Sequence, residues 1–184
     1  MRRSITALAI LGLAASAATG ALAARGDVVN ARIGSYAHYG VRHINLRLDK
    51  IQRVAHIDGG SLAKDRDPGD GTKGYIILSF SEQNAAGTSA GVPGINVAET
   101  LDDQSTITRD TAGPFVGAGR TYAPIELEGK QTVHFRVAQF GIPADRTITK
   151  IIVDPDDGGE KLRYTVTAAN VELVPDVPRA SPAP

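Results

Sequence analysis

The sequence predicts an all-β protein, an antiparallel two-sheet sandwich of about seven to eight strands. Two observations support this prediction. Beyond residue 24 apolar and polar residues alternate, as in a half-buried strand, and apolar residues do not recur every three or four positions as in a helix. Clusters of Gly, Pro and Asp separate the alternating runs and accept the dihedrals of tight turns. A closed barrel fits the same pattern and stays open as an alternative.

The first clear strand runs through HINLRLD, where Ile44, Leu46 and Leu48 alternate with polar residues. Side chains alternate across a strand, so these three would face the core and His43 would face solvent. The alternation slips after Asp49, which predicts a β-bulge there.

Later strands repeat this pattern. In TVHFRVAQF the apolar residues alternate with His134 and Arg136, which would face solvent. Residues 147–154 are apolar on both sides, so we expect that strand to be covered on both faces or to border a second layer. Residues 84–119 are Gly-rich and lack a clear register, so we expect long loops or edge strands there. The remaining strands are expected at residues 27–33, 74–82, 105–109, 121–128 and 162–173, the last interrupted at Ala168, Ala169 and Asn170.

The first 23 residues have the parts of a secretory signal: Arg2 and Arg3, an apolar run, and small residues ending at Ala23. The apolar run is shorter than the roughly 20 residues that a membrane-spanning helix needs. We therefore expect cleavage of residues 1–23, a mature chain from Ala24 and no stable membrane anchor. The protein would be exported, periplasmic or secreted, by either the general or the twin-arginine route.

Composition limits what the mature chain can do. The chain has no Cys, so an exported domain would be held together by packing alone and would contain no thiolate metal site. Loss of the basic signal leaves a small net negative charge, which gives no reason to expect nucleic acid as a partner. Residues 24–174 suit one domain, and the proline-rich residues 175–184 would form an extended, disordered tail.

Residues 127–174 resemble a family of bacterial secreted immunoglobulin-like domains, the type seen in the mycobacterial immunoprotective antigen. The resemblance lies in Gly129 before Phe135-Arg136-Val137, then in Ile142-Pro143-Ala144-Asp145 and the final LRYTVTAANVEL. It implies an immunoglobulin-like sandwich without enzymatic activity. The long Gly-rich middle departs from the family pattern.

Asp65, Asp67 and Asp70 lie in KDRDPGDG and form a candidate calcium loop, since Ca²⁺ takes several carboxylate oxygens from a tight turn. The spacing differs from an EF-hand and no closing glutamate follows, so a solvated hairpin loop is the alternative. A second acidic turn contains Asp154, Asp156, Asp157 and Glu160 and is interpreted as a plain hairpin.

Residues 36–43 gather two histidines and two tyrosines, which suggests a copper or zinc site. A tight site needs a third ligand, and only His56 and His134 are available from elsewhere. Solvent-facing histidines are the alternative. Tyr36, Tyr39 and Tyr122 would be the aromatic residues of a sugar-binding platform, a weak case in a chain without Trp.

Residues 87–91 match G-x-S-x-G around Ser89, and Asp102 or Asp103 and then His134 follow in hydrolase order. A nucleophile elbow needs a helix directly after the serine, and Pro93 and Gly94 oppose a helix there. We therefore interpret this segment as a turn and expect no catalytic residues.

These observations favour an exported, non-enzymatic sandwich that acts as an interaction or binding module without a cofactor, with an unidentified protein as partner. An edge strand in the Gly-rich middle could accept a partner strand by β-augmentation. A small calcium- or transition-metal-binding protein is the alternative.

Overall fold

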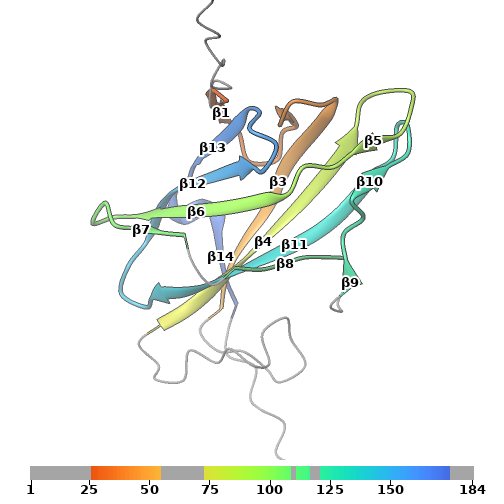
Figure 1. Cartoon of the computed structure of the whole chain (residues 1–184). Coiled ribbons are helices and arrows are strands. Elements are labelled where there is room, and N and C mark those ends of the chain that lie inside the picture. Colours follow the sequence, from red (N-terminus) through yellow and green to blue (C-terminus); the bar gives the residue numbers. More distant parts are fainter. Residues whose placement is uncertain (1–25, 55–72, 109–110, 117–120, 175–184) are drawn as a thin grey trace, which may run out of the picture.

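A computed structural model describes residues 26–54, 73–108, 111–116 and 121–174. Two sheets lie face to face, and the strands of one cross those of the other (Figure 1). The prediction of an all-β sandwich is confirmed. The expected signal segment, the turn with Asp65, Asp67 and Asp70, His56 and the proline-rich tail lie outside the described residues.

The first sheet has five strands and lies toward the viewer in Figure 1. Its central strand β12 pairs antiparallel with β6 on one side and with β13 on the other. In spatial order the strands are β1 (Val28–Ala31), β13 (Lys161–Thr165), β12 (Ile148–Pro155), β6 (Ile95–Leu101) and β7 (Thr106–Ile107).

The second sheet has seven strands around the long pair β4 and β11. One side of β3 pairs with β4, and the other side pairs with β2 along its first half and with β14 along its second. In spatial order the strands are β14 (Val171–Val174), β3 (Ile44–Val54), β4 (Lys73–Asn84), β11 (Thr132–Pro143), β8 (Thr111–Val116) and β9 (Thr121–Tyr122), with β2 (Ala37–Tyr39) beside β3. Two short strands, β5 (Ala90–Gly91) and β10 (Glu126–Leu127), pair separately.

The main core fills the space between the sheets and confirms the predicted alternation. Ile44, Leu46 and Leu48 of β3 are fully buried, whereas His43 is exposed. The predicted bulge is also confirmed, because the register of β3 against β4 shifts between Leu48 and Lys50. The first sheet contributes Val97, Leu101, Ile148, Ile151, Val153, Leu162, Tyr164 and Val166 to the same core.

Two expectations need correction, the course of residues 162–173 and the antiparallel pairing of every strand. Residues 162–173 do not form one interrupted strand: β13 belongs to the first sheet and β14 to the second, and the 3₁₀ turn η1 (Ala168–Asn170) lies on the crossover. β14 and β1 each pair parallel with their neighbours, so the sheets are antiparallel except at these two edges. Alternation reports which face of a strand is buried but not which strand lies beside it.

The expectation that β12 is covered on both faces is wrong. A register shift between Ile148 and Lys150 turns Ile148 toward the same core as Ile151 and Val153. Only Ile152 is left as a half-buried apolar residue on the other face. A bulge, rather than a second covering layer, explains the pattern.

The Gly-rich middle is more regular than expected. It contains the inner strand β6 as well as β5, β8 and the edge strand β7. With these strands, with β2, and with residues 121–128 and 162–173 each divided into two strands, the described part of the chain has fourteen strands, more than the expected seven to eight. Several have only two to four residues, too few for an alternation to be recognised.

Candidate functional site

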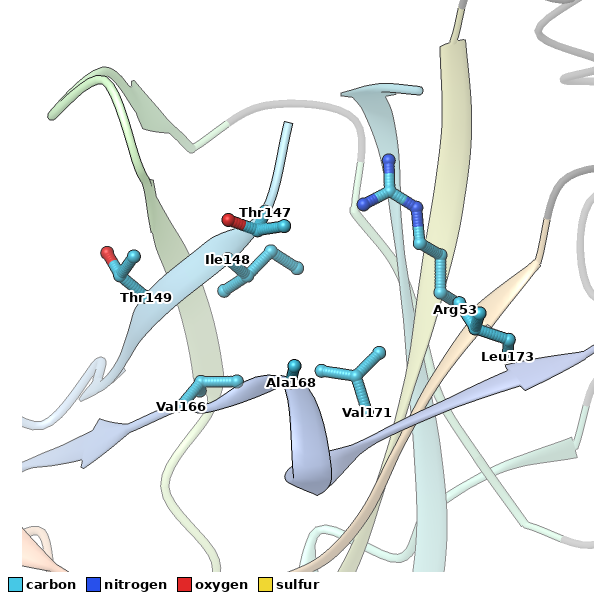
Figure 2. Close-up of a pocket in the computed structure, with 8 residues that line it drawn as sticks. All are labelled: Arg53, Thr147, Ile148, Thr149, Val166, Ala168, Val171 and Leu173. Carbon is cyan, nitrogen blue, oxygen red and sulfur yellow. The ribbon is translucent and has the colours of Figure 1, made fainter. Parts of the chain in front are cut away.

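A cavity of about 420 Å³ opens at the side of the sandwich where the chain crosses from β13 to β14. Figure 2 shows its walls: residues 147–149 at the start of β12, the crossover with Ala168 and Val171, and Arg53 with Leu173 opposite. The lining is mostly aliphatic, with Arg53, Thr147, Ile148, Thr149, Val166, Ala168, Val171 and Leu173. We call this space the crossover cavity.

The strand that borders the crossover cavity is an edge. β14 pairs with β3 on one side and has no strand on its other side among the described residues. Val171 and Leu173 line the cavity, and Leu173 is 73% exposed. Glu172 points to the opposite face, where Lys50 and Gln52 of β3 bind its carboxylate. The edge therefore combines a side without a partner strand among the described residues with apolar side chains toward the cavity, and its one charged residue, Glu172, lies on the opposite face.

Arg53 stabilises one wall of the cavity and does not supply a free charge to it. Its guanidinium donates hydrogen bonds to the carbonyl oxygens of Pro143 and Arg146, both at 2.5 Å. Figure 2 shows the guanidinium turned away from Val171. Thr149 is likewise occupied, since its one hydroxyl hydrogen is shared between the carbonyls of Thr100 and Leu101, at 3.1 and 3.2 Å. The interior is therefore suited to an apolar group.

The residues of the expected esterase triad do not meet. Ser89 is exposed in the connection between β4 and β5, and no helix follows it. Asp103 accepts hydrogen bonds from Ser105 in the turn after β6, which together with Arg146 keeps the pKa of its carboxyl below the usual range. His134 lies on β11 and its Nδ1 bonds to the hydroxyl of Ser81, not to Ser89. Residues 86–88 form a bend and Ala90–Gly91 form β5, so the segment interpreted as a turn is in part a short strand.

The residues of the 36–43 cluster separate into different environments. The ring of Tyr36 lies against the guanidinium of Arg47, 4.7 Å from its centroid. The imidazole of His38 contacts the carboxylate of Glu160 at 2.9 Å. Tyr39 is fully buried, so it cannot be part of an exposed sugar platform. The side chain of Tyr122 is not described.

The second acidic turn is a structural turn, as interpreted. Asp157 accepts hydrogen bonds from the backbone amides of Val41 and Gly159, and Asp156 accepts one from Gly94. These carboxylates therefore already have partners. The described residues contain no group of three or more His, Asp or Glu side chains that could hold a metal ion.

Two carboxyls are buried between the sheets. Burial raises the pKa of Glu82 and the pKa of Glu99 to about 8 each. Both oxygens of Glu99 lack a hydrogen-bond partner within the described part of the chain. Burial also raises the pKa of Tyr39, with Glu82 as the next cause, so this hydroxyl remains a donor across the ordinary pH range.

The crossover cavity was not foreseen from the sequence. Its residues come from β3, β12 and the crossover to β14, which are distant in the chain and meet only through sheet pairing. The one available signal was the irregular Ala168-Ala169-Asn170 between two apolar runs. No helix in the described part of the chain is long and apolar enough to cross a membrane.

The protein is similar to solved structures at low identity. A β-sandwich protein described as uncharacterised, from Clostridium difficile, shares 16% identity with a TM-score of 0.50, over 77% of this chain and 96% of that one. The YjhA protein of Bacillus subtilis shares 14% over 74% and 98% of the two chains (TM-score 0.44), and a conserved hypothetical protein of Bacillus anthracis shares 12% over 72% and 93% (TM-score 0.43).

No protein-family model and no curated protein matches the sequence. The mycobacterial antigen family is therefore not supported by these comparisons. Identities this low show the fold alone, and what the comparisons establish is that the chain has the fold of a β-sandwich.

Proposed function

We propose that this protein is an exported, non-enzymatic binding module that holds an apolar side chain of a partner strand in the crossover cavity. The observation that carries the proposal is the position of this cavity directly beside the unpaired edge of β14. A strand added to that edge would use the free backbone groups of β14 for affinity, and its alternate side chains would enter the cavity.

The dimensions and the chemistry support this occupant. About 420 Å³ lies within the usual size range of binding pockets and accommodates one or two large apolar side chains. The polar groups of Arg53 and Thr149 already have backbone partners, so an apolar side chain in the cavity would not displace water from an unpartnered group of either residue. Expected export and the resemblance of residues 127–174 to secreted immunoglobulin-like domains fit a module that meets its partner outside the cytoplasm.

A fluorescent dye with apolar aromatic rings and one sulfonate group tests the cavity without a known partner. 8-Anilinonaphthalene-1-sulfonate should bind the native protein with a saturable gain in fluorescence. Ala168→Phe places a ring in the cavity and should abolish the gain, whereas Ala169→Phe, next to it on the same turn but outside the lining, should not. Equal responses of the two variants, with unchanged thermal midpoints, would contradict the proposal.

A further inference from the structure

A connected set of polar side chains lies on the outer face of the second sheet. Arg47 of β3, Ser81 of β4 and His134 of β11 are directly opposite one another in the strand register. Asp49 joins them because the bulge before Lys50 keeps it beside Arg47. We call these four residues the Ser81 network.

The hydrogen bonds of the network determine where each proton is. Ser81 is fully buried, and its hydroxyl donates to Oδ2 of Asp49 at 2.5 Å. The Ser81 Oγ also accepts from Arg47 at 3.1 Å and contacts Nδ1 of His134 at 2.7 Å. Since a hydroxyl has one hydrogen, Nδ1 of His134 must be the donor in that contact. Ser81 is thereby saturated and cannot act as a nucleophile.

This arrangement leaves His134 as an oriented acceptor. A neutral imidazole with its hydrogen on Nδ1 has a lone pair on Nε2. Nε2 has no partner among the described residues, and His134 is exposed. The buried hydroxyl therefore fixes the orientation of the ring through Nδ1 and leaves the lone pair of Nε2 available to a ligand.

A cavity of about 330 Å³ lies beside the network. Ser79 is one of its lining residues, and the Ser79 hydroxyl makes no hydrogen bond within the part of the chain that the structure describes. The cavity is lined by Asp49, Ser79, Phe80, His134, Phe135 and Arg136.

We propose that this cavity binds the vicinal hydroxyls of a saccharide. The polar groups around it differ in kind: Nε2 of His134 and the Asp49 carboxylate accept, and the Ser79 hydroxyl both donates and accepts. The Arg136 guanidinium already interacts within the protein and has further N–H donors. Each sugar hydroxyl donates one hydrogen bond and accepts others, so a pair of neighbouring hydroxyls matches this set. An anion would meet the Asp49 carboxylate, and a cation would meet Arg136.

The saccharide site is distinct from the crossover cavity. Its residues belong to β3, β4 and β11 on the outer face of one sheet, whereas the crossover cavity is bounded by both sheets at the β14 side. Failure of one proposal therefore does not decide the other. The site also does not use the tyrosine platform considered from the sequence.

Titration of the ¹⁵N-labelled protein with methyl glycosides of mannose, galactose and glucose tests the site. At least one glycoside should give saturable amide shifts at residues 79–81 and 134–136. His134→Ala and Ser79→Ala should each weaken that affinity about tenfold or more. His38→Ala removes another exposed histidine that is bonded through Nδ1, and it should leave the affinity unchanged.

A second variant and an anionic probe separate loss of the binding site from unfolding and from anion binding. Ser79→Ala leaves the hydrogen bonds of the Ser81 network in place, so its loss of affinity cannot be explained by unfolding of that network. Acetate serves as the anionic probe. The proposal is wrong if no glycoside gives saturable shifts, if both variants bind as the parent does, or if acetate binds these residues more tightly than any glycoside.

Discussion

The hydroxyl of Tyr39 donates a hydrogen bond to the backbone carbonyl of Gly94 at 3.0 Å. Tyr39 ends β2 of the second sheet, and Gly94 directly precedes β6 of the first, so this bond joins the two sheets at one end of the sandwich. The ring is fully buried, and burial raises the pKa of the hydroxyl, which therefore stays protonated. Tyr39, which the sequence shows only as the last residue of a short strand, thus links the two sheets by a hydrogen bond.

Removing only this hydroxyl should destabilise the protein. Tyr39→Phe removes one of the two donors to the Gly94 carbonyl, which keeps the backbone amide of Asp156, and should lower the free energy of unfolding by about 0.5–1.5 kcal/mol. Tyr36→Phe is the matched control because Tyr36 is exposed and meets Arg47 through its ring, so its effect should stay within about 0.5 kcal/mol. Urea unfolding measures both, and equal effects would show that the bond to Gly94 contributes nothing.

Stability should fall as the pH rises from about 4.5 to about 8, the unfolded and folded pKa values of Glu82 and Glu99. In this range the folded state binds more protons than the unfolded state, so the free energy of unfolding decreases with pH. The stabilising contribution of these two carboxyls is fully present below the pKa of the unfolded state. It is lost as the pH rises through the pKa of the folded state. The total change should be on the order of a few kcal/mol.

Glu99→Leu should remove part of this dependence, with the larger gain in stability at pH 8, because the carboxyl has no partner to lose. Glu82 should account for the rest of the pH dependence of stability in this variant. Glu126→Gln changes an exposed carboxyl and should leave the slope as it is. Urea unfolding at several pH values gives the slopes, and a slope of Glu99→Leu equal to that of the parent would contradict the assignment.

Asn84 should be among the most sensitive polar positions. The two hydrogens of its buried amide are shared among the carbonyls of Thr88, Leu127 and Glu128, and its Oδ1 accepts from the backbone amide of Ala86. Asn84→Ala should cost about 2–4 kcal/mol because several backbone groups lose their partner together. Gln83→Ala, one residue earlier and half-buried, should cost less. Thermal unfolding of both variants makes the comparison.

Calcium should not stabilise the mature protein if it is a binding module of the proposed kind. A metal at a hundred times its Kd would add about 2.7 kcal/mol to stability. Thermal unfolding with and without Ca²⁺, Cu²⁺ and Zn²⁺ should therefore give the same midpoint. A large shift with Ca²⁺ that disappears in Asp67→Ala would instead support the alternative of a calcium-binding protein.

The burial pattern was predictable from the sequence wherever a strand is long. Leu46 and Leu48 face the core and His43 and His134 face solvent, because the side-chain period of a strand is two. The bulge after Leu48 was visible as a break in that period. β6 was missed because Val97 and Leu101 flank Glu99, a buried carboxyl that reads as a solvent-facing residue.

The candidate sites were less predictable because they depend on which strands are neighbours. Ser81 and His134 are far apart in the chain, and only the pairing of β4 with β11 brings them together. Likewise Arg53 and Leu173 meet across the cavity because β14 pairs parallel with β3. A single sequence shows the period of each strand, and the order of strands in a sheet is a separate, non-local property.

Mapping the apolar probe onto the structure tests the central claim most directly. If the crossover cavity is the binding site, titration of the ¹⁵N-labelled protein with 8-anilinonaphthalene-1-sulfonate should move the amide signals of residues 147–149, 166–168 and 171–173. The signals should saturate, and Ala168→Phe should abolish the movement. Saturable shifts confined to other parts of the sandwich, or no saturable shift at all, would contradict the account.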